Sequence, residues 1–531
     1  MPFDEEVYID IVGRLKDTTY SQAAITSIEE FFTNVLGNRG YAFAEVTGNP
    51  EINEETNEVK LIFAVEPGNR TYTRKILFTG NNITQDHVLR REMRQFEGAW
   101  SSDNAIEAGK IRLERLGYFK EVNVETIPVP GTDDQIDIIY SVEEETTGSI
   151  GGNIGYSDFG LMLGFNLQEQ NFLGSGNTVG IGINKNVYSE MYNISYMNPY
   201  ATRDGVSLGY NLYYRETDYG EFNVANYLTN SSGFGAQFGY PISDITRLGF
   251  NITYDKTDID IGSLPAREIY DFVSVEGNLF ETLTAQLSWQ RVTLNRGLFP
   301  TDGASTVLSV SSTIPGSDLS YYRLNIRQRY YQPLTKDLVF GFQGELGYLD
   351  AYGDTKEVPF FQNFYAGGPR SLRGFESNTL GPRSTDAPCY EFNYSEGICP
   401  NLIDSDGDGE LDTPYYNPYA NQTSRYRDAP IGGNIKVEGS LQLIFRLPFI
   451  EDQRSLRSAF FFDFGNVFSD NCKDYQINCY KPSIDDLRYS YGVGITWITG
   501  FGPMSLAIAK PTNAGPRERT EEFQFTVGNV F

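Results

Sequence analysis

The sequence predicts a membrane β-barrel of about sixteen antiparallel strands, preceded by tandem α+β modules. Most of the chain after residue 146 alternates apolar and polar residues with a period of two, which is the period of a β-strand. No run of 18 apolar residues occurs, so no transmembrane helix is predicted. The final segment, 523–531, stays largely apolar on one face to its last residue, as a barrel strand in lipid requires, although a sandwich-core strand would look similar.

Charge and composition exclude some classes of protein. The formal net charge of −28 argues against nucleic acid as a partner, because phosphate binding needs clustered lysine and arginine. Acidic loops that face solvent are the simplest explanation of this charge. The mean hydropathy is only −0.37, which a barrel also explains, because each lipid-facing residue alternates with a lumen-facing one.

Two α+β modules are predicted, at residues 1–67 and 68–146. In each, a helix ends near a glycine, and aromatic residues follow as the chain enters a strand; Gly40-Tyr41 and Gly117-Tyr118 mark these places. A turn and a second strand follow in both copies, and self-similarity at roughly 75–80 residues indicates tandem modules. The first copy is short at its start, so we expect the chain to be cut from a longer array, with any signal peptide removed.

Residues 147–531 are predicted to form the barrel. In the segment 206–214, Val206, Leu208 and Tyr210 alternate with Ser207 and Gly209, and other segments repeat this pattern. The apolar, aromatic face suits lipid, and the face of small and polar residues suits a wet lumen. The longest link, 350–432, is predicted to be an extracellular loop, and loops of this length are usually functional.

The four cysteines form two local pairs in polar, turn-rich segments: Cys389 with Cys399, and Cys472 with Cys479. Short pairs of this kind predict loop disulfides formed in an oxidising compartment. His87 is the only histidine, so neither a Ser-His-Asp triad nor a zinc site is expected. The chain is therefore not expected to be an enzyme.

An acidic motif in the long loop partly resembles a calcium-binding loop. Asp404, Asp406, Asp408 and Asp412 occupy ligand positions of an EF-hand-like sequence. The bidentate glutamate is missing, because Tyr415 stands at the last position. The motif is either a weak Ca²⁺ site, completed by another residue, or a solvated acidic loop. No cofactor is required.

The sharpest motif in the long loop is Leu372-Arg373-Gly374-Phe375. It resembles the conserved [V/L]-R-G-[F/Y] tetrapeptide of the BamA-type outer-membrane insertase superfamily. The segment 296–303 is similar to the R-G-x-F-P-T-D-G segment of that family, and 462–467 is similar to its aromatic-Asp-x-Gly-x-Val strand. Residues 72–145 resemble its barrel-proximal POTRA module. The resemblance runs through most of residues 30–531, with the motifs in the expected order.

The resemblance implies that the long loop folds back into the barrel and that Arg373 pairs with lumen acids. Asp463 has lumen parity on its predicted strand and is the expected partner, since a desolvated arginine without an anion is costly. The second acid of the family falls at the position matched to Gln442, which is uncharged. Glu438 has the same parity and is the expected substitute.

The resemblance also implies a central subunit of the barrel-assembly machinery, with a weak seam between its first and last strands. Gly151, Gly152 and Gly155 weaken the order of the first strand. The seam residues expected from both strands are Ile150, Gly151, Gly152, Gly155, Gly528, Asn529 and Phe531. Ile150 and Gly528 are expected to lie close enough for an engineered disulfide. A loose seam exposes a strand edge, which can template an incoming strand.

The resemblance implies a Gram-negative outer membrane location, with the POTRA modules in the periplasm. The expected partners are outer-membrane lipids and lipopolysaccharide, unfolded barrel clients, periplasmic chaperones and accessory lipoproteins. The lipoprotein is expected to dock on Arg90, Arg91, Arg94 and Glu97, although a solvated helix face would look the same. A secretion pore or autotransporter-assembly factor of the same superfamily is an alternative, and a passive porin is another.

Overall fold

The computed structural model describes residues 19–528, except for a long gap at 386–428 and short gaps at 56–57, 158–159, 203, 223, 226, 262–264, 448–449, 451–454, 477–478, 500–501 and 516–517. The chain divides into two compact units. The first comprises Met1–Gly148 with Glu169–Thr178, and the second comprises Ser149–Gln168 with Val179–Phe531.

The first unit begins with a helix packed on a hairpin. Helix α2 spans Gln22–Gly37, and strands β1 (Glu45–Asn53) and β2 (Glu58–Glu66) pair antiparallel. The hydroxyl of Ser21 accepts a hydrogen bond from Ala24 N and so caps the helix. Phe32 and Leu36 are buried on the inner face of α2, and Phe32 meets the ring of Phe63 on β2 edge to face.

A second α+β module follows in the same unit. It contains β3 (Tyr72–Thr79), α3 (Asp86–Arg90), α4 (Asp103–Arg115), β4 (Phe119–Pro128) and β5 (Gln135–Glu144). The sheet order is β3-β5-β4, with β3 parallel and β4 antiparallel to β5. The Ser102 side chain caps α4, and Gly117 follows its end with a positive φ. Leu113, Ile138 and Tyr140 are fully buried between the helices and the sheet.

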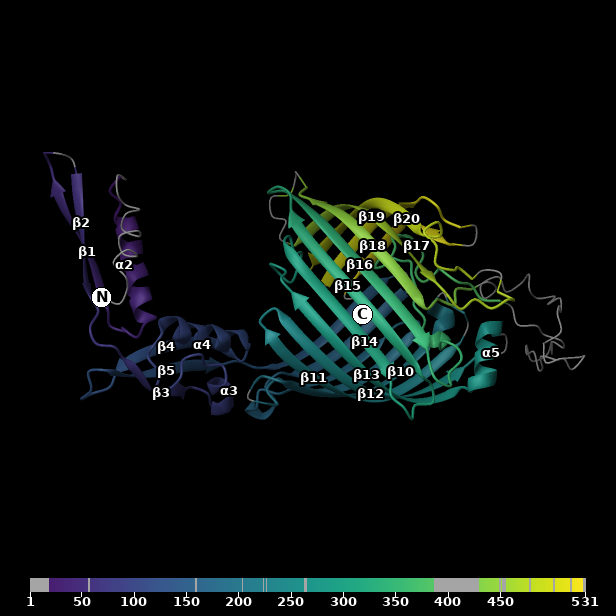
Figure 1. Ribbon diagram of the computed structural model, residues 1–531, viewed down its shortest axis with the longest axis horizontal. Helices are drawn as coiled ribbons and strands as arrows, with labels where there is room; N and C mark the ends of the chain where they lie inside the picture. The colour runs from purple at the N-terminus through teal and green to yellow at the C-terminus, as the bar shows by residue number, and fades with distance from the viewer. Residues whose placement is uncertain are drawn as a thin grey trace, which may run out of the picture. The chain divides into compact units, whose positions relative to one another are not determined.

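The second unit is a β-barrel, which within the described residues closes through sixteen strands (Figure 1). Strands adjacent in sequence pair antiparallel around the wall, and β23 closes on β6. The strands are β6 (Gly148–Ser157), β7 (Gly160–Glu169), β8 (Thr178–Lys185), β9 (Ser189–Asn198), β10 (Ser207–Asp218), β11 (Leu228–Ser243), β12 (Thr246–Asp260), β13 (Leu279–Val292), β14 (Gly303–Thr313), β15 (Tyr321–Pro333), β16 (Leu338–Ala351), β18 (Ile435–Phe445), β19 (Leu456–Phe468), β20 (Arg488–Thr499), β21 (Gly502–Pro511) and β23 (Phe523–Val527).

The predicted alternation places apolar side chains outside. Tyr210, Leu212 and Tyr214 of β10 are all at least 40% exposed, and Tyr210 stacks on Phe234 of the neighbouring strand. The intervening Asn211 points to the other face, opposite Gly235. Such cross-strand pairs make a continuous apolar surface suited to lipid. Among the described helices, none combines the length and the hydropathy needed to span a bilayer.

The loops at one end of the barrel contain a hydrophobic core, which we call the cap. It includes helix α5 (Arg267–Glu276), the turn η3 (Phe360–Gln362) and parts of the long loop between β16 and β18 (Figure 1). Phe272 of α5 meets Phe360 edge to face, with ring centroids 5.4 Å apart. The long loop therefore carries packed structure of its own, although its sequence shows no strand or helix period.

Candidate functional site

The tip of the long loop lies against the inner barrel wall, where Arg373 meets a buried carboxylate on β19. Nε of Arg373 donates to Oδ2 of Asp463, and Nη2 donates to Oδ1, both at 2.7 Å. The Asp463 side chain is 0% exposed and that of Arg373 is 16% exposed. Two parallel hydrogen bonds fix both the position and the plane of the guanidinium. The pair lies where the sequence predicted it.

Two lumen-facing neighbours complete the surroundings of Arg373. Its guanidinium carbon lies 3.4 Å from the ring centroid of Phe461, which is close enough for a cation–π interaction. Its Nη2 also donates to the hydroxyl of Ser440 at 3.0 Å. Ser440 stands across from Asp463 in the β18–β19 register. Gln442, the predicted second partner, instead reaches Ser440 with its own amide at 3.3 Å, because Ser440 occupies the position opposite the acid.

Glu438, the predicted substitute acid, binds the loop through a different residue. The hydroxyl of Ser371 donates to Glu438, and Lys436 Nζ lies 3.0 Å from its other oxygen. Lys436 also lies 3.4 Å from Glu345 of β16. The loop tip is therefore held on β18 by Ser371 and on β19 by Arg373. The sequence did not identify Ser371 or Ser440, because small polar residues are common on every lumen face.

Gly374 lets the loop backbone approach the wall. Its φ is +90°, and a Cβ atom here would lie 3.2 Å from Ala509 Cβ and 3.3 Å from Pro511 Cδ. Glycine adopts this conformation without strain and presents no side chain to the neighbours. As a result, β17 (Gly374–Phe375) pairs with β22 (Thr520–Glu521). The flanking Leu372 and Phe375 are 1% and 0% exposed and belong to the cap core. We call Leu372–Phe375 the latch.

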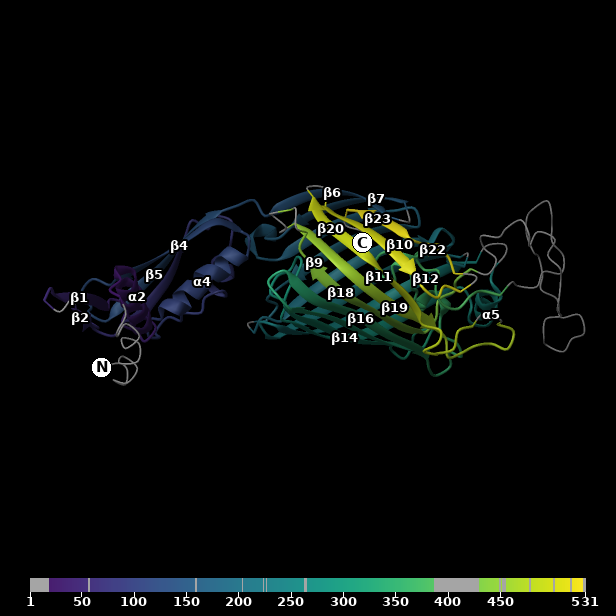
Figure 2. The same cartoon turned by 90° about the horizontal axis from the view of Figure 1, so that it is seen from above.

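The barrel closes at a short contact between its first and last strands. Among the described residues, β23 pairs with β6 at one position, Val527 opposite Tyr156. Both strands are labelled in Figure 2. Ile150, Gly151, Gly152 and Gly155 all lie on β6, as predicted.

The expected proximity of Ile150 and Gly528 is wrong. A Cβ atom on Gly528 would lie 2.6 Å from the carbonyl oxygen of Ile154 and 2.9 Å from Gly155 Cα. The register set by Val527 and Tyr156 explains this, because it carries Gly528 to Gly155, five residues beyond Ile150. Asn529 and Phe531, also predicted at the seam, lie outside the described residues.

The four charged residues predicted as a docking surface differ in their surroundings. Arg90 pairs with Asp86 at 3.0 Å and with Glu97 at 3.2 Å, and Glu97 accepts a hydrogen bond from Ile76 N. Arg91 is only 14% exposed and lies 3.7 Å from the buried Glu92. Arg94 is exposed and has no ion pair among the described residues.

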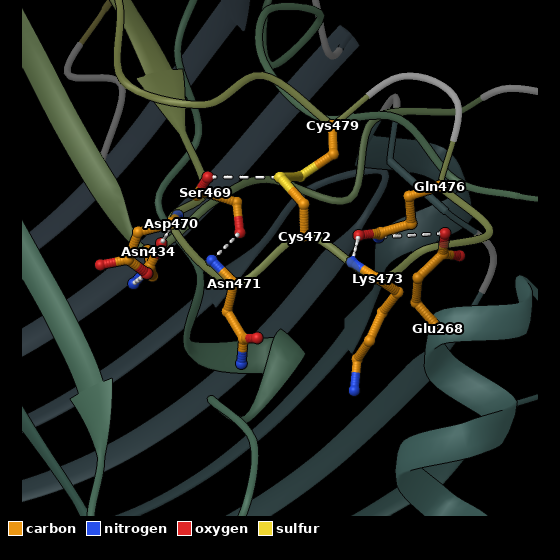
Figure 3. The surroundings of a disulfide bond; sticks show 9 residues. All are labelled: Glu268, Asn434, Ser469, Asp470, Asn471, Cys472, Lys473, Gln476 and Cys479. Atoms are coloured by element: carbon orange, nitrogen blue, oxygen red, sulfur yellow. Dashed lines mark hydrogen bonds between the residues drawn. A yellow bond between two sulfur atoms is a disulfide. The ribbon is translucent and has the colours of Figure 1, made fainter.

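One of the two predicted disulfides is present in the loop between β19 and β20. Cys472 and Cys479 are bonded, and the residues between them reach other loops of the cap (Figure 3). Lys473 pairs with Glu357, the Tyr475 hydroxyl donates to Asp271 at 2.8 Å, and Gln476 donates to Glu268 at 3.2 Å.

Glu268 and Asp271 both lie on α5. Burial raises the pKa of the Glu268 carboxyl, against hydrogen bonds from Thr385 N and Gln476. Glu268 is therefore a titratable group inside the contact between α5 and the disulfide loop.

The remaining predicted residues cannot be placed. Cys389, Cys399, Asp404, Asp406, Asp408 and Asp412 all lie outside the described residues. In the part of the chain that the structure describes, no cluster of three or more His, Cys, Asp or Glu side chains has the arrangement of a metal site.

Comparison with known proteins gives matches along nearly the whole chain. Residues 171–531 match the family model described as the Omp85 superfamily domain. Residues 2–68 and 71–145 match the POTRA model, described as a surface antigen variable number repeat. The two matched repeats correspond to the two α+β modules of the first unit.

Individual relatives agree with these matches. The outer membrane protein assembly factor BamA of Neisseria meningitidis serogroup B is 30% identical over 96% of this chain and 63% of its own length. The crystal structure of BamA from Haemophilus ducreyi lacking POTRA domains 1–3 has a TM-score of 0.80 at 31% identity, covering 99% of this chain and 97% of that one. CdiB from Escherichia coli has a TM-score of 0.53 at 11% identity over 99% of this chain and 88% of its own, a likeness of fold alone.

The chain spans 45–63% of the length of the first curated relatives that it matches. A barrel of sixteen strands with POTRA modules indicates a protein of the Gram-negative outer membrane whose POTRA modules lie in the periplasm. The matched domain covers more than half of the chain and includes the latch, Asp463 and the last strand. The chain belongs to the Omp85 superfamily.

Proposed function

We propose that the protein is the central subunit of the outer-membrane barrel-assembly machinery and inserts β-barrel proteins through the seam between β6 and β23. The observation that carries this proposal is the single residue pair, Val527 with Tyr156, at which the described parts of these strands meet. Relatives named as assembly factors at about 30% identity support it. No covalent chemistry is needed, since the protein lowers a barrier to folding.

The physical basis of the proposal is the cost of unpaired backbone groups in lipid. Each N–H or C=O group without a partner in a bilayer costs several kcal/mol, which is why membrane barrels are closed. A seam held by few hydrogen bonds is the part of the wall that opens at lowest cost. Its edge then supplies the partners that an incoming strand needs, by β-augmentation.

A passive porin is the less favoured alternative, because a porin needs an open lumen. Here the loop tip occupies part of the lumen: Arg373 of the latch bonds to Asp463 and Ser440, and the preceding Ser371 bonds to Glu438. A secretion pore or autotransporter-assembly factor of the same superfamily is the other alternative. CdiB shares this fold at low identity, so the fold alone does not separate the two functions.

Reconstitution tests the proposal against both alternatives. The full-length protein in proteoliposomes should accelerate the folding of several unrelated outer-membrane barrels, measured by the heat-modifiable mobility of the folded barrels on gels. Single-channel conductance recorded on the same vesicles reports an open pore. Steady conductance with no acceleration of folding would favour a pore and contradict the proposal.

The proposed partners are outer-membrane lipids and lipopolysaccharide, unfolded barrel clients, periplasmic chaperones and an accessory lipoprotein. We place the lipoprotein contact at Arg94, because it is exposed while Arg90 and Glu97 bond to each other. Arg94→Glu should weaken co-purification of the lipoprotein. Lys110→Glu on α4 is the matched charge reversal and should leave it unchanged. Equal retention of the lipoprotein by both variants would show that Arg94 is not part of the lipoprotein-binding surface.

A weak Ca²⁺ site at Asp404, Asp406, Asp408 and Asp412 remains a separate proposal. Calorimetric titration with CaCl₂ should show binding that is lost when Asp404 and Asp408 are both replaced by Asn. Equal heats for the wild-type protein and the double variant would leave only a solvated acidic loop.

A further inference from the structure

Gln524 is a buried amide on the strand that forms the seam. Its neighbours Phe523 and Phe525 are 57% and 36% exposed and face outward, whereas Gln524 is 2% exposed and faces the lumen. It lines a lumen cavity of about 220 Å³ that Arg373 and Thr526 also line. A buried amide is costly unless its donor and acceptor are both satisfied.

Both halves of this amide bond to the latch backbone. Nε2 of Gln524 donates to the carbonyl oxygen of Phe375 at 2.8 Å. Its Oε1 accepts a hydrogen bond from Gly374 N at 3.3 Å. The β17–β22 pairing extends this attachment, and Glu376 N donates to Arg519 O at 3.0 Å one residue further along. The latch is thus joined to the last strand and to the segment that leads into it.

The same latch is joined to a different part of the wall. Arg373 bonds to Asp463 on β19, and β20 and β21 separate β19 from β23 in the barrel order. Adjacent residues of the latch therefore bond to strands three positions apart. Arg373 and Gly374 are consecutive, so a single peptide unit joins the attachment on β19 to the attachment on β23.

The described part of the last strand has few other attachments. One edge pairs with β21 along Phe523–Val527, and the other meets β6 at Val527. Gln524 stands three residues from Val527, roughly 10 Å along a strand. The latch contact is thus near the single described residue pair of the seam.

We propose that Gln524 is a positioning residue that couples the latch to the seam, so that the arrangement of the loop sets the geometry of β23 against β6. The importance of this coupling for client insertion rests on the proposed function. The coupling itself is a property of the barrel alone. A purely structural role, in which Gln524 only satisfies buried loop groups, would leave the seam unaffected.

Disulfide formation between Cys substituted at Tyr156 and Val527 measures the seam without any client. These positions are opposed in the register, and the initial rate under fixed oxidant reports how often they come within bonding distance. Gln524→Leu should lower this rate roughly 2- to 10-fold, the range expected for one lost hydrogen bond. The protein without the two substitutions controls for the native cysteines.

Thr526→Val is the matched control. Thr526 lies on the same strand and lines the same cavity, and no hydrogen bond from its side chain to the latch exists among the described residues. It should crosslink at the wild-type rate. In an Arg373→Ala background, Gln524→Leu should add little, because the loop is already released. If Gln524→Leu does not fold, Gln524→Asn keeps the amide but shortens its reach and serves instead.

Each outcome decides the inference. A rate for Gln524→Leu equal to that of Thr526→Val would overturn it, and so would full additivity with Arg373→Ala. Client folding is measured separately on the same variants. Slower crosslinking with normal client folding would support the coupling and count against the seam as the insertion route.

Discussion

The latch and the seam lie close together on the last strands of the barrel, yet they are built in opposite ways. The latch joins a guanidinium and a carboxylate of 16% and 0% exposure through paired hydrogen bonds. The seam joins two strands of the wall through one described residue pair. By contrast, β11 and β12 pair along most of Leu228–Ser243 and Thr246–Asp260. Within the described residues, the interior contact is thus held by several hydrogen bonds, whereas the seam is joined at one residue pair.

Cooperativity is not uniform around the wall of this barrel. Elsewhere, separating two strands would break a long ladder of hydrogen bonds, and lipid offers the exposed groups no replacement. At the seam the described residues form one pair, and under the proposed function the wall parts there while the remaining strands stay paired. The latch is bonded to Gln524 of β23 and so attaches the loop to the strand on one side of the seam.

Locking the seam is the most severe way to test this comparison. A disulfide between Tyr156→Cys and Val527→Cys should abolish client insertion in proteoliposomes, because the free edge is no longer available. Reductant should restore insertion, and wild-type protein with and without reductant controls for the native disulfides. Insertion at the wild-type rate by fully crosslinked protein would show that the seam is not the route.

Releasing the latch should have the next largest effect. Arg373→Ala leaves the buried Asp463 carboxylate unpaired, so the barrel should lose about 3–5 kcal/mol of stability against denaturant in detergent. The double variant Arg373→Ala/Asp463→Ala removes both charges and should recover part of this loss. If Arg373→Ala unfolds at the same denaturant concentration as the wild-type protein, the ion pair contributes nothing to the stability of the barrel.

Removing the disulfide tests whether the cap is a second region of high local stability. Replacing Cys472 and Cys479 with serine opens a loop with a sequence separation of seven and should cost about 2.5 kcal/mol by chain entropy. Hydrogen exchange should rise in α5 and near Glu357, because residues of this loop bond to both. Faster exchange at the seam instead would mean that the cap and the wall are one cooperative unit.

The smallest expected effect concerns the protonation of Glu268. Burial raises the pKa of the Glu268 carboxyl above its ordinary value of 4.5, so the cost of ionising it in the fold is absent below pH 4.5, grows as pH rises above that value and is complete above the folded pKa. The cap contact should therefore be tighter in mild acid than at neutral pH. Glu268→Gln should remove this pH dependence in hydrogen exchange of α5. An unchanged pH profile in that variant would assign the effect to another group.

Period-two patterning was enough to predict the barrel and the direction of its side chains. Asp463 could be assigned to the lumen because its neighbours Phe462 and Phe464 alternate with it, and family resemblance supplied Arg373. Ser440 could not be chosen over Gln442, because both have lumen parity and only the β18–β19 register distinguishes them. The predicted register of the seam was wrong for a similar reason. The sequence of a strand does not show which residue of a distant strand lies opposite each of its own residues.

The cap was missed for a different reason. Phe360, Phe364 and Phe375 pack together without a common strand or helix, so no period in the sequence shows them to be a core. Gln524 was also missed. A polar residue between two apolar ones is the ordinary pattern of a barrel strand, so its sequence does not distinguish it from other lumen-facing residues. Its two hydrogen bonds to the latch depend on where the loop returns.

The Cys472–Cys479 bond makes the contacts of the cap depend on disulfide formation. Lys473, Tyr475 and Gln476 reach their partners from within the ring that this bond closes, so the contacts are favoured only after two electrons have been removed from the thiols. We expect a chain with these two cysteines reduced to hold the contacts of this loop less firmly. The packing of the cap therefore depends on oxidation of these two thiols in an oxidising compartment.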